Sequence, residues 1–473
     1  MNKTECKDKG IKFQAVGRRE IVAEFNGGTI TSDGGALLLR ELEQRREIIK
    51  QFSECFTDYR NQEQVEHPLE DLLAQRIYGL VLGYEDLNDH DQLRKDPLLA
   101  TIIGKTDPGG ERRRRASDRG AALAGKSTLN RLELRTDDLS KDKGYKKISV
   151  NGKAVDEFFV KIFLQAHHKP PKQIILDLDA TDDPLHGNQE GRFFHGYYGG
   201  YCYLPLYIFC GDFLLCARLR EANKDQSAGS VEELERIVKQ IRHCWPDVAI
   251  IVRADSGFAR EEIMQWCENN GVDYVLGLAK NSRLLGIISK QMGQAEILWQ
   301  MFAKPARVFT SFQYQTLDSW SRARRVVGKA EHLDKGANPR FIVTSLPGWE
   351  MDARPLYEEL YCGRGEMENR IKEQQLELFA DRTSATLMKA NQLRLWLSSV
   401  AYIMLNEVRR VGLADTSMEQ AQCGTIRLKL LKIGAQIKVS IRRVFVALSS
   451  SYPYQELFLQ VYRNLTALEP LRC

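Results

Sequence analysis

Hydrophobic positions in the first 170 residues recur mostly at the spacing of amphipathic helices. Residues 34–46 and 68–83 show this pattern, and turn-rich pieces separate the helical stretches. The region ends beyond a strongly charged stretch at residues 107–119. We therefore predict a mostly helical N-terminal domain that covers residues 1–170.

From residue 173 the pattern changes to short apolar runs rich in β-branched and aromatic residues, which is typical of strands. The runs cover residues 174–178, 201–210, 213–219, 248–252 and 272–278. Helical segments at 231–244 and 260–269 separate the later runs, so those strands need parallel crossovers, whereas Gly211 and Asp212 predict a hairpin. Residues 171–284 are therefore predicted to form an α/β domain, a mixed sheet flanked by helices.

The alternation of strands and helices stops at residues 285–350, where strand-like pieces predict a β-rich insertion. The chain then becomes helical, and residues 351–415 are expected to complete the α/β domain. The last segment, residues 416–473, contains a strict alternation of apolar and polar positions at 436–442. This alternation suits a strand with one basic face, although a helix is also compatible with it.

The composition, 43% hydrophobic and 28% charged over 473 residues, is that of a globular protein with roughly two to four domains. No apolar stretch is long enough to cross a bilayer, and the first residues lack the apolar core of a secretory signal. The ten cysteines include no C-x-x-C pair that would indicate zinc or redox chemistry. We therefore expect a cytoplasmic protein with no membrane partner.

Basic residues are unevenly distributed, although the net charge is only +5. Residues 112–115 are four consecutive arginines, and residues 424–455 contain six basic side chains and no acidic one. These six are Arg427, Lys429, Lys432, Lys438, Arg442 and Arg443. Either cluster alone is compatible with a solvated face, but the two together favour a polyanion as the partner. We take Lys438, Arg442 and Arg443 as candidate phosphate-binding residues.

Acidic residues lie at the ends of two predicted strands. Alternation in the strand at 174–181 points Asp177 and Asp179 to one side. Ionised carboxylates on a buried strand are unfavourable, so a metal ion or a basic side chain is expected opposite them. Asp255 follows the apolar run at 249–252, at the end of a parallel strand where α/β sheets place ligands. A solvated strand end and a helix N-cap are the respective structural alternatives.

The segment 356–378 is predicted to be a helix with one polar face. At about 100° per residue, its residues Tyr361, Arg364, Glu368 and Lys372 fall within a sector of about 80°. An ordinary surface helix with i,i+4 ion pairs would also carry such charges. With the two strand-tip aspartates, however, this glutamate completes a set of oxygen ligands for two Mg²⁺ ions in phosphoryl transfer. Arg364 and Lys372 would then hold the phosphate backbone.

At these positions the sequence resembles the DDE transposases of bacterial insertion sequences, in the branch whose last motif reads Tyr, two residues, Arg, three residues, Glu. Residues 361–368 match this motif, and residues 179–181 and 253–258 are similar to the first and second motifs of the branch. The sequence looks closest to the thirteen-eighty group of insertion sequences. That likeness rests on residues 178–184, 193–198 and 368–373, and on 32–36 and 83–90 in the N-terminal region.

The resemblance implies a ribonuclease-H-like catalytic domain in which Asp179, Asp255 and Glu368 are the catalytic metal ligands. It implies magnesium-dependent cleavage and strand transfer at the inverted repeats of a mobile element, with Mn²⁺ able to replace Mg²⁺. The expected partners are the double-stranded DNA of the element's ends and of the target, bound by a homodimer or a higher oligomer. We expect Tyr361 to contact DNA beside Arg364 and Lys372, the N-terminal domain to bind DNA, and the protein to associate with the bacterial nucleoid.

Three details of this interpretation stay open at the level of sequence. The branch motif continues with six residues and then a lysine, but Gln375 stands at that position, and Lys372 lies one turn earlier on the same face. Asp177 shares the strand face with Asp179, so either can be the first ligand. His186 and His195 lie in a loop rich in glycine and aromatic residues, and their roles are undefined.

Two other functions are compatible with parts of the sequence. The run Leu176-Asp177-Leu178-Asp179-Ala180-Thr181 resembles the nucleophile motif of haloacid-dehalogenase-like phosphatases, in which Asp177 would be phosphorylated. That reading leaves the polar face around Glu368 unexplained. A DNA-binding protein that uses its basic segments without cutting would not need the three carboxylates.

Overall fold

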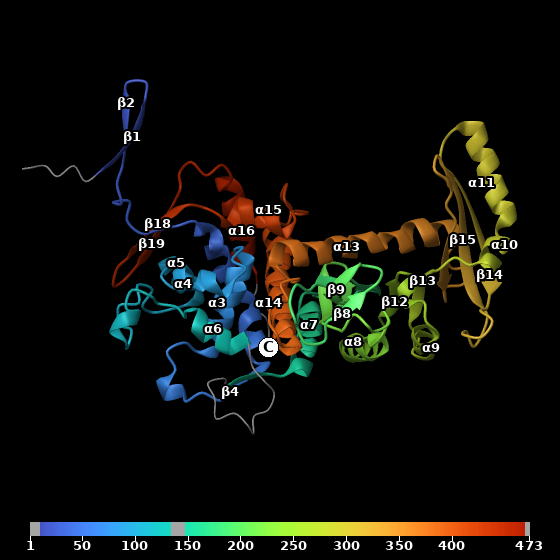
Figure 1. Ribbon diagram of the computed structural model, residues 1–473, viewed down its shortest axis with the longest axis horizontal. Helices are drawn as coiled ribbons and strands as arrows, with labels where there is room; N and C mark the ends of the chain where they lie inside the picture. Colours follow the sequence, from blue (N-terminus) through green and yellow to red (C-terminus); the bar gives the residue numbers. More distant parts are fainter. Residues whose placement is uncertain (1–9, 134–146, 469–473) are drawn as a thin grey trace, which may run out of the picture.

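The computed structural model describes residues 10–133 and 147–468 (Figure 1). The remaining parts of the expected first and last domains, 1–9, 134–146 and 469–473, lie outside the described residues. The prediction of a mixed α/β protein is confirmed, because a large mixed sheet is accompanied by many helices. No described helix is both long and apolar enough to span a membrane.

A helical body forms the half of the molecule that contains the N-terminal region. Its main helices are α1 (Leu37–Arg46), α2 (Ile48–Ser53), α3 (Leu69–Val81), α5 (Pro97–Ile103), α6 (Lys126–Glu133) and α7 (Gly152–Gln165). Local sequence sets the helix starts: the Asp96 side chain accepts a hydrogen bond from the amide of Leu98 at 2.7 Å, and Pro97 occupies the first turn of α5. A C-terminal helix, α14 (Met388–Glu407), joins the same core, and every residue at 395–407 is buried.

The large sheet has the strand order β11-β10-β6-β12-β13-β17-β15-β14, with β16 paired to β15. Its first five strands are β11 (Phe213–Arg218), β10 (Leu206–Cys210), β6 (Gln173–Ala180), β12 (Ala249–Ala254) and β13 (Asp273–Leu278). The predicted hairpin is confirmed, since β10 and β11 are antiparallel and Gly211 turns at φ +56°. Strands β6, β12 and β13 are parallel, as the intervening helices α8 (Ser230–Cys244) and α9 (Glu261–Asn269) require.

The strands of the expected β-rich insertion continue this sheet. They are β14 (Ala306–Tyr314), β15 (Arg324–Leu333), β16 (Gly336–Ala337) and β17 (Arg340–Thr344). Strand β17 pairs antiparallel with β13, so the outer strands cover an edge that would otherwise be open. The segment begins with two helices, α10 (Ser282–Ile287) and α11 (Ser289–Phe302), and α11 packs on β14 and β15 (Figure 1).

The helical stretch that begins at residue 353 is less regular than its sequence pattern predicts. It consists of α12 (Ala353–Pro355), a π-helical piece η6 (Leu356–Tyr361), a 3₁₀ piece η7 (Cys362–Arg364), α13 (Gly365–Lys372) and a second π-helical piece η8 (Glu373–Glu377). Leu356 and Tyr357 pack on Ile251 and Val275 of the sheet. The assumption of 100° per residue is therefore wrong for η6, η7 and η8, because π turns contain more residues than α turns and 3₁₀ turns contain fewer.

The chain also forms two three-stranded sheets. Strands β7 (Asp183–Pro184), β8 (Phe193–His195) and β9 (Gly200–Tyr203) form one sheet, in the order β7-β9-β8. In the C-terminal segment, β18 (Ala435–Val439) pairs with β19 (Val444–Leu448) and with β3 (Ile30–Thr31) near the start of the chain. The alternating segment is thus a strand, but it ends at Val439, and Ser440 and Arg443 close a turn.

Candidate functional site

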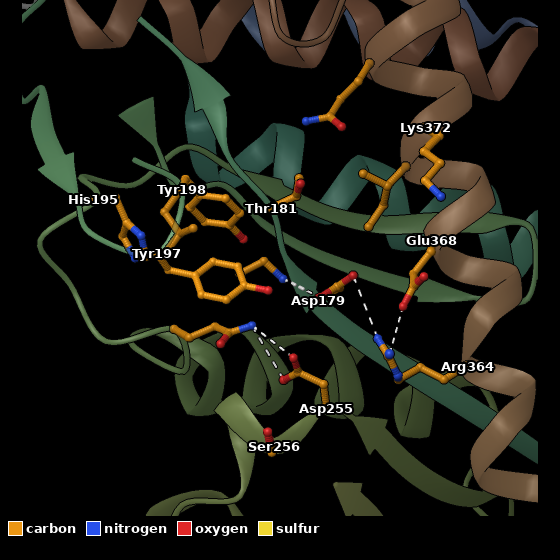
Figure 2. A pocket seen from close by; sticks show the side chains of 15 residues that line it. Asp179, Thr181, His195, Tyr197, Tyr198, Asp255, Ser256, Arg364, Glu368 and Lys372 are labelled. Carbon is orange, nitrogen blue, oxygen red and sulfur yellow. Dashed lines mark hydrogen bonds and ion pairs between the residues drawn. The ribbon is translucent and has the colours of Figure 1, made fainter. Parts of the chain in front are cut away.

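A cavity of about 640 Å³ opens beside the carboxyl ends of β6 and β12 (Figure 2). Asp179 and Asp255 line it from the sheet, and Arg364, Glu368 and Lys372 line it from α13 and the turn before it. Parallel strands end at a common edge, which explains how residues 76 positions apart along the chain reach one place. The three carboxylates predicted from the sequence therefore face a single cavity.

Asp179 lies near the end of β6, on the strand face opposite to the apolar side chains of Leu176 and Leu178. Its side chain is only 15% exposed, and one carboxylate oxygen accepts a hydrogen bond from the Ala180 amide at 2.9 Å. Burial raises the pKa of the Asp179 carboxyl to about 7, and the charge of Asp255 adds to this rise while Arg364 opposes it. The site thus contains a buried carboxyl that lacks a sufficient positive charge.

Asp255 follows β12 directly and caps the short helix η5 (Ser256–Phe258). Its Oδ1 atom accepts a hydrogen bond from the Gly257 amide at 2.8 Å, which fixes the orientation of the carboxylate. The amide nitrogen of Gln226 lies 3.4 Å from Oδ2, at the outer limit of a hydrogen bond. The N-cap alternative and a functional role are therefore compatible, because Asp255 lines the cavity while it caps η5.

Arg364 stands between two of the carboxylates. Its Nη2 atom lies 2.7 Å from Oε1 of Glu368, and its Nη1 atom lies 4.0 Å from Oδ2 of Asp179. The helix is anchored by buried apolar side chains: Met367 is 2% exposed, and Ile371, which also lines the cavity, is 3% exposed. This packing holds the polar face of α13 against the cavity, as Figure 2 shows.

Tyr361 was predicted on the same face but does not line the cavity. It packs at the base of the helix, where a Cβ atom on Gly277 of β13 would come within 2.6 Å of its hydroxyl oxygen. Glycine at this strand position therefore allows the helix to approach the sheet. Burial raises the pKa of the Tyr361 hydroxyl, so this group stays protonated.

Asp177, the other candidate for the first ligand, makes a different set of contacts. Arg253 is its neighbour on β12 and donates two hydrogen bonds to its carboxylate, Nε to Oδ1 at 2.5 Å and Nη2 to Oδ2 at 2.7 Å. The same guanidinium donates to the carbonyl oxygen of Leu360 at 2.5 Å, within the π-helical piece. Asp177 is 3% exposed and is not among the residues that line the cavity.

Gln375, which replaces the lysine of the branch motif, lines the cavity beside Lys372. Its amide nitrogen donates to Oδ1 of Asp183 at 2.9 Å and to the carbonyl oxygen of Asp182 at 3.1 Å. Asp183 is fully buried, and burial raises the pKa of its carboxyl to about 8 while the bond from Gln375 opposes this. The amide of Gln375 therefore satisfies one oxygen of this carboxyl, while Oδ2 of Asp183 has no hydrogen-bond partner among the described residues.

Aromatic residues on the β7-β9-β8 side form a wall that the sequence reasoning did not assign. Tyr197, Tyr198 and His195 line the cavity, whereas His186 does not. Residues 193–201 are conspicuous in the sequence as a dense run of aromatic residues and glycines. The spacing of these residues does not, however, indicate that they lie near the carboxylates.

The basic C-terminal residues Lys438, Arg442 and Arg443 do not line this cavity. They lie on β18 and the turn that follows it, and Figure 1 shows β18 well apart from α13. Any phosphate that they bind is therefore distant from the three carboxylates.

The donor atoms suit a hard divalent cation, although the carboxylates do not close around one. Among residues 10–133 and 147–468, no group of three or more acidic, histidine or cysteine side chains is close enough to form a metal site. The guanidinium of Arg364 instead pairs with Glu368 at 2.7 Å and lies 4.0 Å from Asp179, whose charge it offsets only in part. Three carboxylates on one cavity, one of them with a raised pKa, fit the oxygen preference of Mg²⁺, and a bound cation would compete with Arg364.

Comparison with known families gives one match that covers nearly the whole chain. The model of the family described as transposase DDE domain group 1 matches residues 13–470. A comparison with curated proteins gives no significant match.

Proposed function

Because the chain belongs to the transposase DDE domain family of group 1, we propose that it cuts DNA at the inverted repeats of a mobile element and joins those ends to a target. The observation that carries the proposal is the convergence of Asp179, Asp255 and Glu368 on one cavity. Two strand tips and one helix supply them, so the arrangement depends on the fold and not on one local motif.

The residues present fit two divalent cations, and Asp179, Asp255 and Glu368 would hold them. Bound Mg²⁺, or Mn²⁺ in its place, would activate the attacking hydroxyl and stabilise the leaving oxygen during phosphoryl transfer. Arg364 is paired with carboxylates in this structure, and a bound cation that took over those carboxylates would leave its guanidinium available to contact a phosphate. Lys372 lies one turn further along and extends the positive wall, and Tyr361 supports the helix from below.

Asp179 is the better candidate for the first ligand than Asp177. Two hydrogen bonds from Arg253 occupy both oxygens of Asp177, whereas Asp179 faces the cavity. The same contacts argue against the phosphatase alternative, because a phosphorylated nucleophile must be reachable by its substrate. Asp177 therefore has a structural role in this proposal, as the partner of Arg253.

The wider architecture supports a ribonuclease-H-like catalytic domain, and the motifs at residues 178–184, 193–198 and 368–373 support the thirteen-eighty group. Three antiparallel strands, β11, β10 and β6, are followed by two strands parallel to β6 in the same sheet. We propose residues 171–284 and 351–415 as the catalytic parts, 285–350 as an insertion within their sheet, and 1–170 and 416–473 as DNA-binding regions. Pairing of two element ends would require at least a homodimer, working on nucleoid DNA in the bacterial cytoplasm.

The proposal is tested with purified protein, Mg²⁺ and duplex DNA that carries an end of the element. Asp255→Asn and Glu368→Gln should reduce cutting by at least about 10³-fold and leave DNA binding intact, since each substitution keeps the shape and removes a charge. Glu366→Gln is the matched control, because Glu366 lies on the same helix, is exposed and does not line the cavity. Unimpaired cutting by both cavity variants would refute the proposal, and binding without any cutting would favour the non-catalytic alternative.

A further inference from the structure

The hairpin of β18 and β19 ends in a tip whose apolar side chains face solvent. Ile441 is fully exposed, Phe445 is 60% exposed and Val439 is 45% exposed. Figure 1 shows the two strands at the end of the molecule opposite to α11 and β14. One exposed apolar residue needs no explanation, but three on the same hairpin tip indicate a contact surface.

The base of this hairpin is fixed to the helical body. Ala435 and Ile437 are 3% and 4% exposed and belong to the same hydrophobic core as α14. The amide of Ile437 also donates a hydrogen bond to the carbonyl oxygen of Thr29 at 2.8 Å, beside the pairing of β18 with β3. The exposed tip is therefore carried by a support that is buried and hydrogen-bonded.

The tip itself is closed by hydrogen bonds across the turn. The Ser440 amide donates to the carbonyl oxygen of Arg443 at 2.8 Å, and the Arg443 amide donates to Oγ of Ser440 at 3.1 Å. Ile441 and Arg442 lie between these residues and are held outside the ladder. Because the turn is already ordered, a ligand that contacts Ile441 loses less conformational entropy on binding.

Positive charge surrounds the apolar tip. Lys438, Arg442 and Arg443 are exposed, and their side chains make no hydrogen bond or ion pair with the residues that the structure describes. Lys432, by contrast, is used inside the protein, where it pairs with Asp33 at 2.7 Å. Residues 424–455 contain no acidic residue. The charge of the tip is thus free to attract a polyanion.

We propose that Ile441 inserts between adjacent base pairs of the bound DNA and bends it, while Lys438, Arg442 and Arg443 contact the phosphates on either side. This inference rests on the proposed function, which assigns DNA as the ligand of the C-terminal segment. An apolar side chain that enters a base step partly unstacks the two pairs and kinks the duplex. The free energy lost in unstacking is offset by the extra contacts that bent DNA makes with the protein.

Phosphate binding alone does not account for the composition of the tip. Contacts with phosphates are made by polar and basic groups, so they explain Arg442 and Arg443 but not the isoleucine beside them. An isoleucine side chain that leaves water for the space between two base pairs gains the free energy of apolar burial. The neighbouring arginines bring the backbone close enough for this insertion to occur.

The test compares two DNA probes in a chelating buffer, with the full chain carrying Glu368→Gln so that no strand is cut. One probe is a linear duplex of the terminal repeat and its flank. The other has the same sequence closed into a circle shorter than one persistence length, about 150 base pairs. The Glu368→Gln parent should bind the circle about 10- to 100-fold more tightly, because the circle is already bent.

Substitution of Ile441 separates insertion from phosphate contact. Ile441→Ala should reduce the preference for the circle to less than about threefold, because the alanine methyl group is too small to hold a base step open. Ile441→Leu should retain the preference. Energy transfer between dyes at the two ends of the linear probe should show the ends closer together with the parent and Ile441→Leu than with Ile441→Ala.

Two control variants complete the comparison. Leu428→Ala removes an exposed apolar side chain of the same C-terminal segment outside the hairpin, and it should change neither affinity. Lys438→Gln should weaken binding of both probes by the same factor, because it removes a phosphate contact and leaves the insertion intact. Equal urea midpoints for the parent and Ile441→Ala would show that the substitution leaves the fold unchanged.

The insertion is overturned if the parent shows no preference for the circle, if Ile441→Ala keeps that preference, or if it weakens both probes equally. Binding of the parent to vesicles of anionic phospholipid but to neither probe would make the tip a membrane contact and overturn it as well. The proposed function fails by a different result. A protein that bends DNA through Ile441 but, with Glu368 restored, never cuts with Mg²⁺ would refute the catalytic proposal alone.

Discussion

Substitution of Asp179 by asparagine should stabilise the metal-free protein while removing its activity. The pKa of the folded Asp179 carboxyl is about 7, compared with about 3.9 for an aspartate in an unfolded chain. A difference of about 3 pKa units corresponds to on the order of 4 kcal/mol of free energy against the folded state once the carboxyl is fully ionised. Asparagine has nearly the same shape and cannot ionise, so it avoids this penalty.

The sign of the pH dependence follows from which state binds the proton. Between about pH 4 and 7 the folded chain holds a proton on Asp179 that the unfolded chain has lost, so stability falls as pH rises through this interval and levels off above it. The advantage of Asp179→Asn should therefore grow from about 1 to 2 kcal/mol at pH 5 to about 4 kcal/mol at pH 8. Asp183, whose pKa is raised to about 8, has a similar dependence in both proteins and cancels from the difference.

The assay is urea-induced unfolding of both proteins at pH 5 and pH 8 in a chelating buffer, followed by circular dichroism. Asp177→Asn is the matched control on the same strand face. It leaves the buried guanidinium of Arg253 without a charged partner, so it should destabilise the chain by up to about 3 to 5 kcal/mol. A variant Asp179→Asn that is less stable than the unaltered chain at pH 8, or a gain that does not change with pH, would refute the reasoning.

Three further predictions concern the cation, the C-terminal segment and the glutamine of the helix. Binding of Mg²⁺ should release about half a proton near pH 7, because the Asp179 carboxyl, whose pKa is about 7, must ionise. Calorimetry in buffers of different ionisation enthalpy measures the number of protons released. Neutralising Lys438, Arg442 and Arg443 should reduce the slope of log affinity for DNA against log salt by about 2 to 3; an unchanged slope would show that they do not contact phosphates. Gln375→Ala should lower the free energy of unfolding by about 1 to 3 kcal/mol, because it leaves a buried oxygen of Asp183 without a donor, and an unchanged urea midpoint would contradict this.

Local patterns in the sequence predicted the elements that carry the site. Alternation at residues 174–180 placed the apolar side chains of β6 on one face and its aspartates on the other, as the structure shows. The position of Asp255 just after an apolar strand placed it at the edge where Asp179 also lies. Their assignment as metal ligands, with Glu368, stays a prediction.

The sequence does not show which residues or strands pair with one another when they lie far apart along the chain. Arg253 pairs with Asp177 across 76 residues, and nothing near either residue identifies the other as its partner. Periodicity shows which face of a strand is buried but not which strand lies next to it. The pairing of β17 with β13 and of β18 with β3 could therefore not be derived from the sequence.

The shared sheet also limits how the chain can be shortened. Removing residues 306–344 would uncover the edge of β13, and its free peptide groups would pair with strands of other molecules and cause aggregation. The same strand contains Gly277, against which Tyr361 and the glutamate-bearing helix rest. The outer strands therefore support the sheet edge that carries the candidate site, and a minimal fragment designed from this chain must keep them or replace them with another strand.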